Sequence, residues 1–141
     1  MPLGRANVVR EGGDVTIVAI GWMLGKALAA ADRLAEEGVS AEVIDPRTLA
    51  PLDTATVIKS VEKTGRLVVA DQSTRHASAA SVIAADVATD GFAALTAPIK
   101  LVCALDATIP YSEPMEEYLL PDEDKIVAGV REVMSSSAVT A

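Results

Sequence analysis

Short apolar runs alternate along this chain with segments of helical periodicity, and no other feature constrains its fold as much. The apolar runs cover residues 14–20, 41–45, 66–71 and 99–103. Runs of this length that are rich in Val, Ile and Leu are typical of buried strands. Helical segments follow them at residues 22–37, 53–63, 77–89 and 121–134. Since strand and helix alternate, we expect a mostly parallel sheet with helices on both faces, a three-layer α/β/α sandwich.

The length of 141 residues fits one domain, and a hydrophobic content of 50% is enough for a core. We expect residues 1–134 to form this domain and residues 135–141 to be a disordered tail. Aromatic residues make up only 3% of the chain, so the core must consist mainly of Ala, Val, Ile and Leu. Such a core favours a sheet covered by helices over a β-sandwich.

Two segments lie outside the alternation. Residues 5–9 are expected to form an edge strand, and the following Glu11-Gly12-Gly13 has the double glycine of a tight hairpin. Residues 106–121 contain three prolines, which predicts an extended, irregular segment.

The net charge is −8, from 12 basic and 20 acidic residues. This balance argues against nucleic acid as a partner and favours a basic protein. Cys103 is the only cysteine, so the chain can form neither an internal disulfide nor a cysteine-based metal site. No apolar run approaches the ~18 residues that cross a bilayer, and the N-terminus lacks the pattern of a signal peptide. We therefore expect a cytoplasmic protein without membrane contact.

Charged residues follow the carboxyl ends of two predicted strands: Asp45, Arg47, Asp71, Arg75 and His76. Ligands often bind at this edge of an α/β sheet. One hypothesis is a crevice in which these side chains perform acid/base chemistry or hold an anion. The other, which we favour, is that the two aspartates cap turns or helix ends and that Arg47 pairs with one of them.

Other candidate positions have structural interpretations. The glycines and lysine of residues 21–26 lie between a strand and a helix, but their spacing departs from that of a phosphate-binding loop. Asp53 is expected to cap the following helix, Cys103 to be an inert core thiol, and the single His76 to be a surface or capping residue. We therefore predict no catalytic, cofactor-binding or metal-binding residue.

Residues 106–124 contain seven acidic residues and no Lys or Arg, interleaved with Tyr111, Met115 and Tyr118. Acidic residues mixed with aromatic and aliphatic anchors indicate a docking surface for a basic protein. The alternative is a solvated loop whose apolar residues fold back on the core, and in which Asp122 to Asp124 only favour a helix N-terminus. The candidate docking residues are Glu113, Glu116, Glu117, Tyr118, Asp122, Glu123 and Asp124.

Several motifs resemble one known family in order and spacing. They are VREGGDVTIVAIG, EVIDPRTLAPLD, SVEKTGRLVVAD, APIKLV and IPYSEPMEEYLLP, and the resemblance covers residues 3–134. The family is the C-terminal domain of the β subunit of thiamine-diphosphate-dependent 2-oxo acid dehydrogenases. The resemblance implies the transketolase C-terminal domain fold, whose mixed five-stranded sheet has one antiparallel strand. We expect that strand to be the first, at residues 5–9.

The resemblance also implies a function for the parent enzyme, which decarboxylates a 2-oxo acid or cleaves acetoin and passes the acyl group to lipoyl groups of an acyltransferase core. Thiamine diphosphate and Mg²⁺ would be held by other domains, so the chain is expected to be a fragment that begins in the linker of residues 3–6 and is inactive alone. Its implied partners are an α subunit and a second β subunit of a heterotetramer, and the basic subunit-binding domain of the acyltransferase. Asp45, Arg47 and Asp53 would then be structural loop residues.

The sequence departs from many relatives at Pro46 and in residues 72–80, where a glycine-rich, acidic run common in pyruvate enzymes is missing. Residues 72–80, together with APIKLV and IPYSEPMEE, are closer to acetoin-cleaving and some actinobacterial-type relatives, which leaves the substrate open. The alternative from another class is a free-standing α/β module that binds a ligand in a crevice of Asp45, Arg47 and Asp71.

Overall fold

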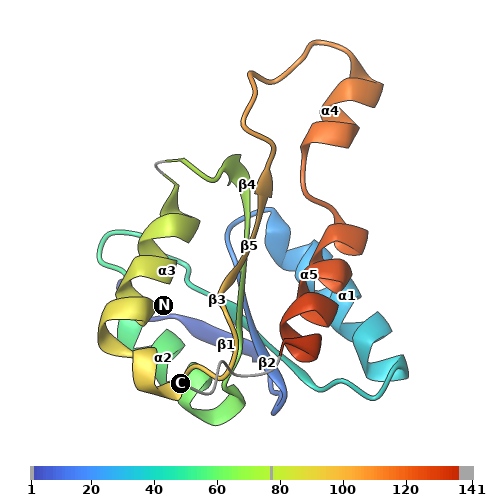
Figure 1. Cartoon of the computed structure of the whole chain (residues 1–141). Coiled ribbons are helices and arrows are strands. Elements are labelled where there is room, and N and C mark those ends of the chain that lie inside the picture. The colour runs from blue at the N-terminus through green and yellow to red at the C-terminus, as the bar shows by residue number, and fades with distance from the viewer. Residues whose placement is uncertain (1, 77, 137–141) are drawn as a thin grey trace.

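The computed structural model describes residues 2–76 and 78–136 and contains one five-stranded sheet (Figure 1). Its strand order is β1-β3-β2-β4-β5. β1 pairs antiparallel with β3, and the other neighbours pair in parallel, so the predicted mixed sheet with an antiparallel first strand is confirmed. The strands are β1 (Asn7–Arg10), β2 (Val15–Ala19), β3 (Ala41–Asp45), β4 (Leu67–Thr74) and β5 (Lys100–Ala104).

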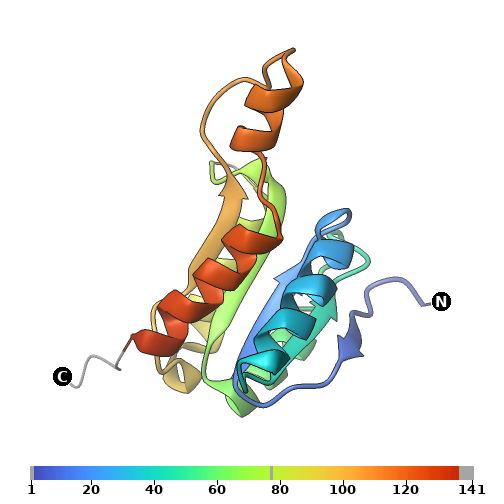
Figure 2. The same cartoon turned by 90° about the vertical axis from the view of Figure 1, so that its right-hand side faces the viewer.

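Helices cover both faces of the sheet, which confirms the predicted three-layer sandwich (Figures 1 and 2). Helices α1 (Met23–Glu36) and α5 (Glu123–Ser135) share one face, and α2 (Thr54–Thr64) and α3 (Ala79–Asp90) share the other. In β2, Val15, Ile17 and Ala19 pack toward α1 and α5, whereas Val18 packs toward α2 and α3. This alternation follows from the two-residue period of a strand, and it explains why a central strand is apolar on both sides.

The predicted hairpin at Glu11-Gly12-Gly13 is wrong, because β1 pairs with β3 and has no contact with β2 in the sheet. The crossover through α1 places β3 on one side of β2, and β4 pairs with the other side. The first strand can therefore pair only with the outer edge of β3. Neither Gly12 nor Gly13 has a positive φ. Gly12 is needed for a close approach, since a Cβ there would lie 2.2 Å from the carbonyl carbon of Ala41.

The proline-rich segment is also more regular than predicted, because it contains helix α4 (Glu113–Leu119). Pro114 lies in the first turn of this helix. Proline is tolerated there because the first amide groups of a helix have no intrahelical acceptor. The prolines therefore shape the start of a short helix instead of preventing one.

Most other element boundaries agree with the predictions to within a few residues. A short 3₁₀ helix, η1 (Phe92–Ala94), precedes β5. Ser78 caps α3, which begins at Ala79; the predicted start at residue 77 lies outside the described residues. Helix α5 continues to Ser135, the first residue of the predicted tail, and residues 137–141 of that tail lie outside the described part. Within the described residues, no helix has the length and apolar character that crossing a membrane requires.

Candidate functional site

Asp45 and Arg47 meet at the carboxyl end of β3, but not as an ion pair. The Asp45 carboxylate accepts a hydrogen bond from the backbone N–H of Arg47 at 2.9 Å. Arg47 has a positive φ of 58°, and among the described residues its guanidinium makes no ion pair, so the predicted pairing of this side chain is wrong. Ile20, Gly21, Pro46 and Leu49 join the two residues around a crevice of about 380 Å³.

Asp71 does not line this crevice. Its buried carboxylate accepts a hydrogen bond from the backbone N–H of Ser73 at 3.0 Å, within the irregular last part of β4. It also accepts from the N–H of Ala80 at 3.4 Å, so it caps the first turn of α3, a helix end, as predicted. His76 is exposed, and its Nδ1 lies 3.0 Å from Asp106. The structure thus separates Asp71 from Asp45 and Arg47, and the three residues do not form one ligand crevice.

Cys103 and Asp53 have structural surroundings. Burial, with the nearby Asp71 charge, raises the pKa of the half-buried Cys103 thiol to about 11, so the thiolate is scarce at neutral pH. Asp53 caps α2 as predicted and accepts hydrogen bonds from the N–H groups of Thr56 at 3.2 Å and Ala6 at 3.0 Å. Burial alone would raise the pKa of Asp53, but the hydrogen bond from the Thr56 hydroxyl, together with the two backbone hydrogen bonds, outweighs it and lowers that pKa. Asp53 therefore ties the N-terminal segment to the start of α2.

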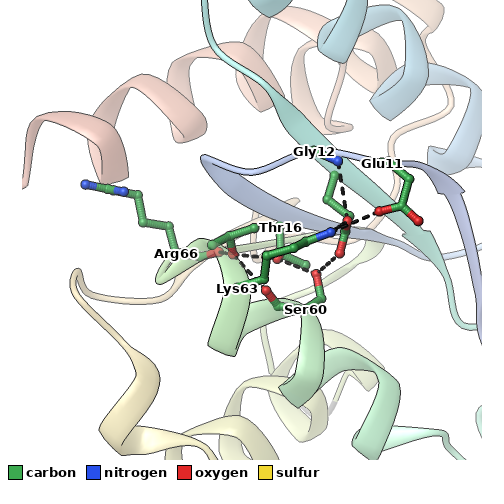
Figure 3. Close-up of polar contacts among 8 residues, drawn as sticks. Glu11, Gly12, Thr16, Ser60, Lys63 and Arg66 are labelled. Atoms are coloured by element: carbon green, nitrogen blue, oxygen red, sulfur yellow. Dashed lines mark hydrogen bonds and ion pairs between the residues drawn. The ribbon is translucent and has the colours of Figure 1, made fainter.

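A buried polar cluster lies between β2, β3 and α2, and the sequence interpretation missed it (Figure 3). At its centre is Glu42, a strand residue with only 2% exposure. Its carboxylate accepts hydrogen bonds from Ser60, Lys63 and the backbone of Gly12. Ser60 in turn lies 2.6 Å from the hydroxyl of Thr16, which also bonds Thr64 at 2.7 Å. We call Thr16, Glu42, Ser60, Lys63 and Thr64 the Glu42 cluster.

The Glu42 cluster places the carboxylate of Glu42 in the core and pairs it with the ammonium group of Lys63. Burial raises the pKa of Glu42, but the hydrogen bonds from Lys63, Ser60 and Gly12 reverse this and lower it. The same contact raises the pKa of Lys63, which also reaches Glu11 at 3.0 Å. A carboxylate beside a serine hydroxyl resembles an activated nucleophile, yet Ser60 is only 4% exposed and its hydroxyl is engaged by both Glu42 and Thr16. The cluster is therefore a structural link between sheet and helix.

The sequence contains a signal for this cluster. Glu42 interrupts the buried apolar residues of β3, which precede Asp45 at its end. Ser60 and Thr64 lie four residues apart, on the same face of α2 as the buried Val57 and Val61. Polar groups placed among buried positions must find partners, so their coincidence predicts a hydrogen-bonded network.

The segment of residues 105–120, which we call the arm, projects beyond the carboxyl edge of the sheet and carries α4 at its tip (Figures 1 and 2). At its base, the N–H of Leu105 donates to the carbonyl of Leu119 at 3.1 Å. Four large apolar side chains along the arm are exposed rather than folded back on the core: Ile109, Tyr111, Met115 and Tyr118. Glu113, Glu116 and Glu117 are exposed beside them and make no ion pair with any described residue.

The structure divides the predicted docking residues into two groups. Those on α4 are free, whereas the three that follow are partly engaged within the chain. Asp122 caps α5 by accepting from the N–H of Lys125 at 2.8 Å. Asp124 pairs with Arg33 at 2.7 Å, and Glu123 is half-buried in the first turn of α5. Acids at this end are also favoured by the helix dipole, as the alternative hypothesis for the acidic segment expects, whereas docking at α4 stays a prediction.

A magnesium ion would require a set of oxygen ligands. Among residues 2–76 and 78–136, no group of three or more His, Cys, Asp or Glu side chains is arranged to hold a metal ion.

Comparisons with known proteins agree with this architecture. The β subunit of an acetoin:2,6-dichlorophenolindophenol oxidoreductase from Cupriavidus necator is 46% identical over 134 residues, which are 95% of this chain and 40% of that protein. The β subunit of the pyruvate dehydrogenase E1 component from Bacillus subtilis is 40% identical over 132 residues, 94% of this chain and 40% of that protein. The chain thus spans about two fifths of the length of these relatives.

A solved structure described as a split-gene transketolase, an inactive β4 tetramer, superimposes with a TM-score of 0.86 at 31% identity. The match covers 97% of this chain and 44% of that one. Residues 4–126 match the family described as "Transketolase, C-terminal domain". The resemblance inferred from the motifs is thereby confirmed, and this chain belongs to the transketolase C-terminal domain family.

Proposed function

We propose that this chain serves as the non-catalytic C-terminal domain of the β subunit of a thiamine-diphosphate-dependent 2-oxo acid dehydrogenase, with roles in subunit assembly and in docking to the acyltransferase core. The single observation that carries the proposal is the arm, which exposes apolar side chains and acidic side chains that pair with no other residue in the described part of the chain. An element of this kind is typical of a surface that another protein covers.

The apolar side chains of the arm support the assembly role. Ile109, Tyr111, Met115 and Tyr118 together place aromatic and aliphatic surface in water on a segment far from the core. Aromatic residues and methionine are enriched at protein interfaces. The proposed partners are the α subunit and the second β subunit of a heterotetramer. A related structure described as a β4 tetramer shows that a relative associates with copies of itself.

The free carboxylates of α4 support the docking role. Glu113, Glu116 and Glu117 lie within five residues, and no lysine or arginine occurs between residues 106 and 124. Complementary charge steers a basic domain toward such a surface and fixes its orientation. The proposed partner is the basic subunit-binding domain of the acyltransferase.

Thiamine diphosphate and Mg²⁺ are assigned by this proposal to other domains of the parent enzyme, which supply the decarboxylation chemistry. The strand ends support that division. Asp71 bonds the backbone of β4 and of the first turn of α3, and Asp45 bonds the backbone of its own loop. The proposal includes a cytoplasmic location. The proposed substrate is acetoin or a 2-oxo acid, and assay of the assembled enzyme with acetoin, pyruvate and branched-chain 2-oxo acids identifies it.

Titration of this chain with the isolated subunit-binding domain of the acyltransferase core tests the docking role. Binding should be measured by calorimetry at low and high salt, for the parent chain and for a variant with Glu113→Gln, Glu116→Gln and Glu117→Gln. We expect affinity to fall with salt, and the variant to bind about tenfold more weakly at low salt with a smaller salt dependence.

A matched control removes three exposed acids elsewhere, through Glu36→Gln, Glu62→Gln and Asp90→Asn. This control has the same net charge as the α4 variant but leaves the arm intact, and it should bind like the parent chain. Binding that is absent, indifferent to salt, or weakened equally by both variants would contradict docking at the arm.

A further inference from the structure

A groove lies between the start of α1 and the acidic helix α4, and we call it the Trp22 groove. It has a volume of about 560 Å³. Trp22 and Lys26 form its α1 wall, Glu113, Glu116 and Glu117 form its α4 wall, and Leu120, Pro121 and Asp122 complete it. The groove therefore joins an aromatic residue from early in the chain to the free carboxylates of the arm.

Packing in the core does not account for the position of Trp22 in this groove. It immediately precedes α1, its side chain makes no capping hydrogen bond, and the residue is 57% exposed. The ammonium nitrogen of Lys26 lies 4.5 Å from the centre of its ring. A cation at this distance over an indole face is held by the ring quadrupole. The ring thus already receives a cation, supplied by its own helix.

The charge around the ring is unbalanced. Four carboxylates line the groove, from Asp122 and the three glutamates of α4, against the single ammonium of Lys26. Asp122 is partly neutralised by Lys125, whose ammonium lies 3.5 Å away, but the glutamates make no ion pair with any described residue. An aromatic face surrounded by carboxylates suits an arginine for two reasons. The guanidinium group stacks on aromatic rings, and it forms two parallel hydrogen bonds with a carboxylate.

We infer that the Trp22 groove is where a basic segment of the docked partner anchors, with a partner arginine replacing Lys26 on the Trp22 ring and pairing with the glutamates of α4. The inference rests on the proposed docking function and adds to it an anchor on α1, outside the acidic segment. Aromatic residues paired with arginine are frequent energetic centres of interfaces. Lys26 acts as an internal competitor that the partner must displace.

Fluorescence tests the inference directly, because Trp22 is the only tryptophan of the chain. The probe is the isolated subunit-binding domain of the acyltransferase, with any tryptophan of its own replaced by phenylalanine. Binding in the groove should shift the Trp22 emission and protect it from acrylamide quenching, because the ring passes from water into an interface. Calorimetry on the same samples reports affinity independently of the fluorophore.

Two single variants have opposite expected effects. Trp22→Ala should weaken binding by about tenfold, since it removes the anchor. Lys26→Met should strengthen binding severalfold, since it removes both the competing cation and a like charge. Lys59→Met is the matched control, because Lys59 is an exposed lysine of α2 on the opposite face of the sheet, and it should leave affinity within about twofold of the parent.

The outcomes distinguish a failure of the docking function from a failure of the Trp22 groove alone. No binding by the parent chain at any salt concentration would overturn the docking function and the groove with it. Salt-dependent binding that leaves Trp22 emission unchanged, or that Trp22→Ala and Lys26→Met affect no more than Lys59→Met does, would overturn the groove alone. Tighter binding by Lys26→Met cannot arise from misfolding, so this variant remains informative even if Trp22→Ala lowers stability.

Discussion

At the scale of single residues, Glu42 shows how a charge is accommodated in an apolar core. Burying a carboxylate is costly unless it is paired and hydrogen-bonded. Ser60, Lys63 and the Gly12 amide supply those partners from a helix and from the turn before β2. Removal of any one partner should therefore cost more than an exposed contact of the same kind.

Glu42→Gln should make the stability of the chain less dependent on pH. The pKa of Glu42 is lower in the folded chain than its usual value of 4.5, so folding favours the ionised form. Its contribution is therefore present above pH 4.5 and is lost as pH falls toward the lowered pKa. We expect the variant to lose about 2 kcal/mol at pH 7 and to flatten the acid limb, measured by urea unfolding at several pH values.

Glu62→Gln is the control for this prediction, because Glu62 is exposed on the same helix. Its unfolding free energy should stay within about 0.5 kcal/mol of the parent. Equal losses in the two variants would contradict the role of the Glu42 cluster.

Arg47 matters through its backbone, whose φ of 58° is unfavourable for a residue with a Cβ. Arg47→Gly should change the free energy of unfolding by less than about 0.5 kcal/mol, because glycine adopts this conformation without strain. Arg47→Val should cost about 1–2 kcal/mol, because a β-branched side chain increases the clash. Chemical denaturation of both variants measures the difference, and equal stabilities would show that backbone strain is not the deciding factor.

At the scale of elements, two helical glycines have opposite surroundings. A Cβ on Gly129 of α5 would lie 2.9 Å from Cγ2 of Val102 in β5, whereas a Cβ on Gly25 of α1 would have no atom within 4 Å. Gly25→Ala should therefore stabilise the chain by about 0.5–1 kcal/mol through helix propensity. Gly129→Ala should destabilise it by about 1–3 kcal/mol through overpacking.

Thermal unfolding of both alanine variants checks this pair. A gain in stability from Gly129→Ala would mean that α5 does not pack closely against β5. The two substitutions add the same atoms to the same kind of element, so the comparison isolates the effect of packing.

Some of these elements can be predicted from the sequence alone, and others cannot. The apolar runs and helical periodicity predicted the central strands and four of the helices, because each pattern reflects which side of an element is buried. The hairpin at Gly12 and the irregular segment around Pro114 were wrong for local reasons. A glycine needed for a close approach looks like a turn glycine, and a proline that starts a helix looks like one that breaks it.

At the scale of the whole molecule, neighbouring residues of α4 belong to different surfaces. Tyr118 is 74% exposed on the arm, whereas Leu119 is 7% exposed at the base, where the arm returns to the core. Tyr118→Ser should leave the melting temperature of the chain nearly unchanged but weaken association in the assembled enzyme, because a hydroxyl replaces an interface anchor.

Leu119→Ser is the contrasting variant and should cost about 2–4 kcal/mol of stability in the chain itself, since it leaves a cavity and buries a hydroxyl. Differential scanning calorimetry measures stability, and analytical ultracentrifugation of the assembled enzyme measures association. If Tyr118→Ser lowered the melting temperature as much as Leu119→Ser, the arm would contribute to the core of this chain and not to a partner's surface.

The sequence by itself determined the layered α/β architecture, the caps at Asp53 and Asp71 and the acidic character of residues 106–124, because each depends on periodicity, on local hydrogen bonding or on composition. Only the tertiary structure decided which distant groups meet. It separated Asp71 from Asp45 and Arg47, gathered the Glu42 cluster from three elements, and placed Trp22 beside the glutamates of α4. These contacts depend on strand order and on the path of the chain between elements, and residue spacing along the sequence does not encode them directly.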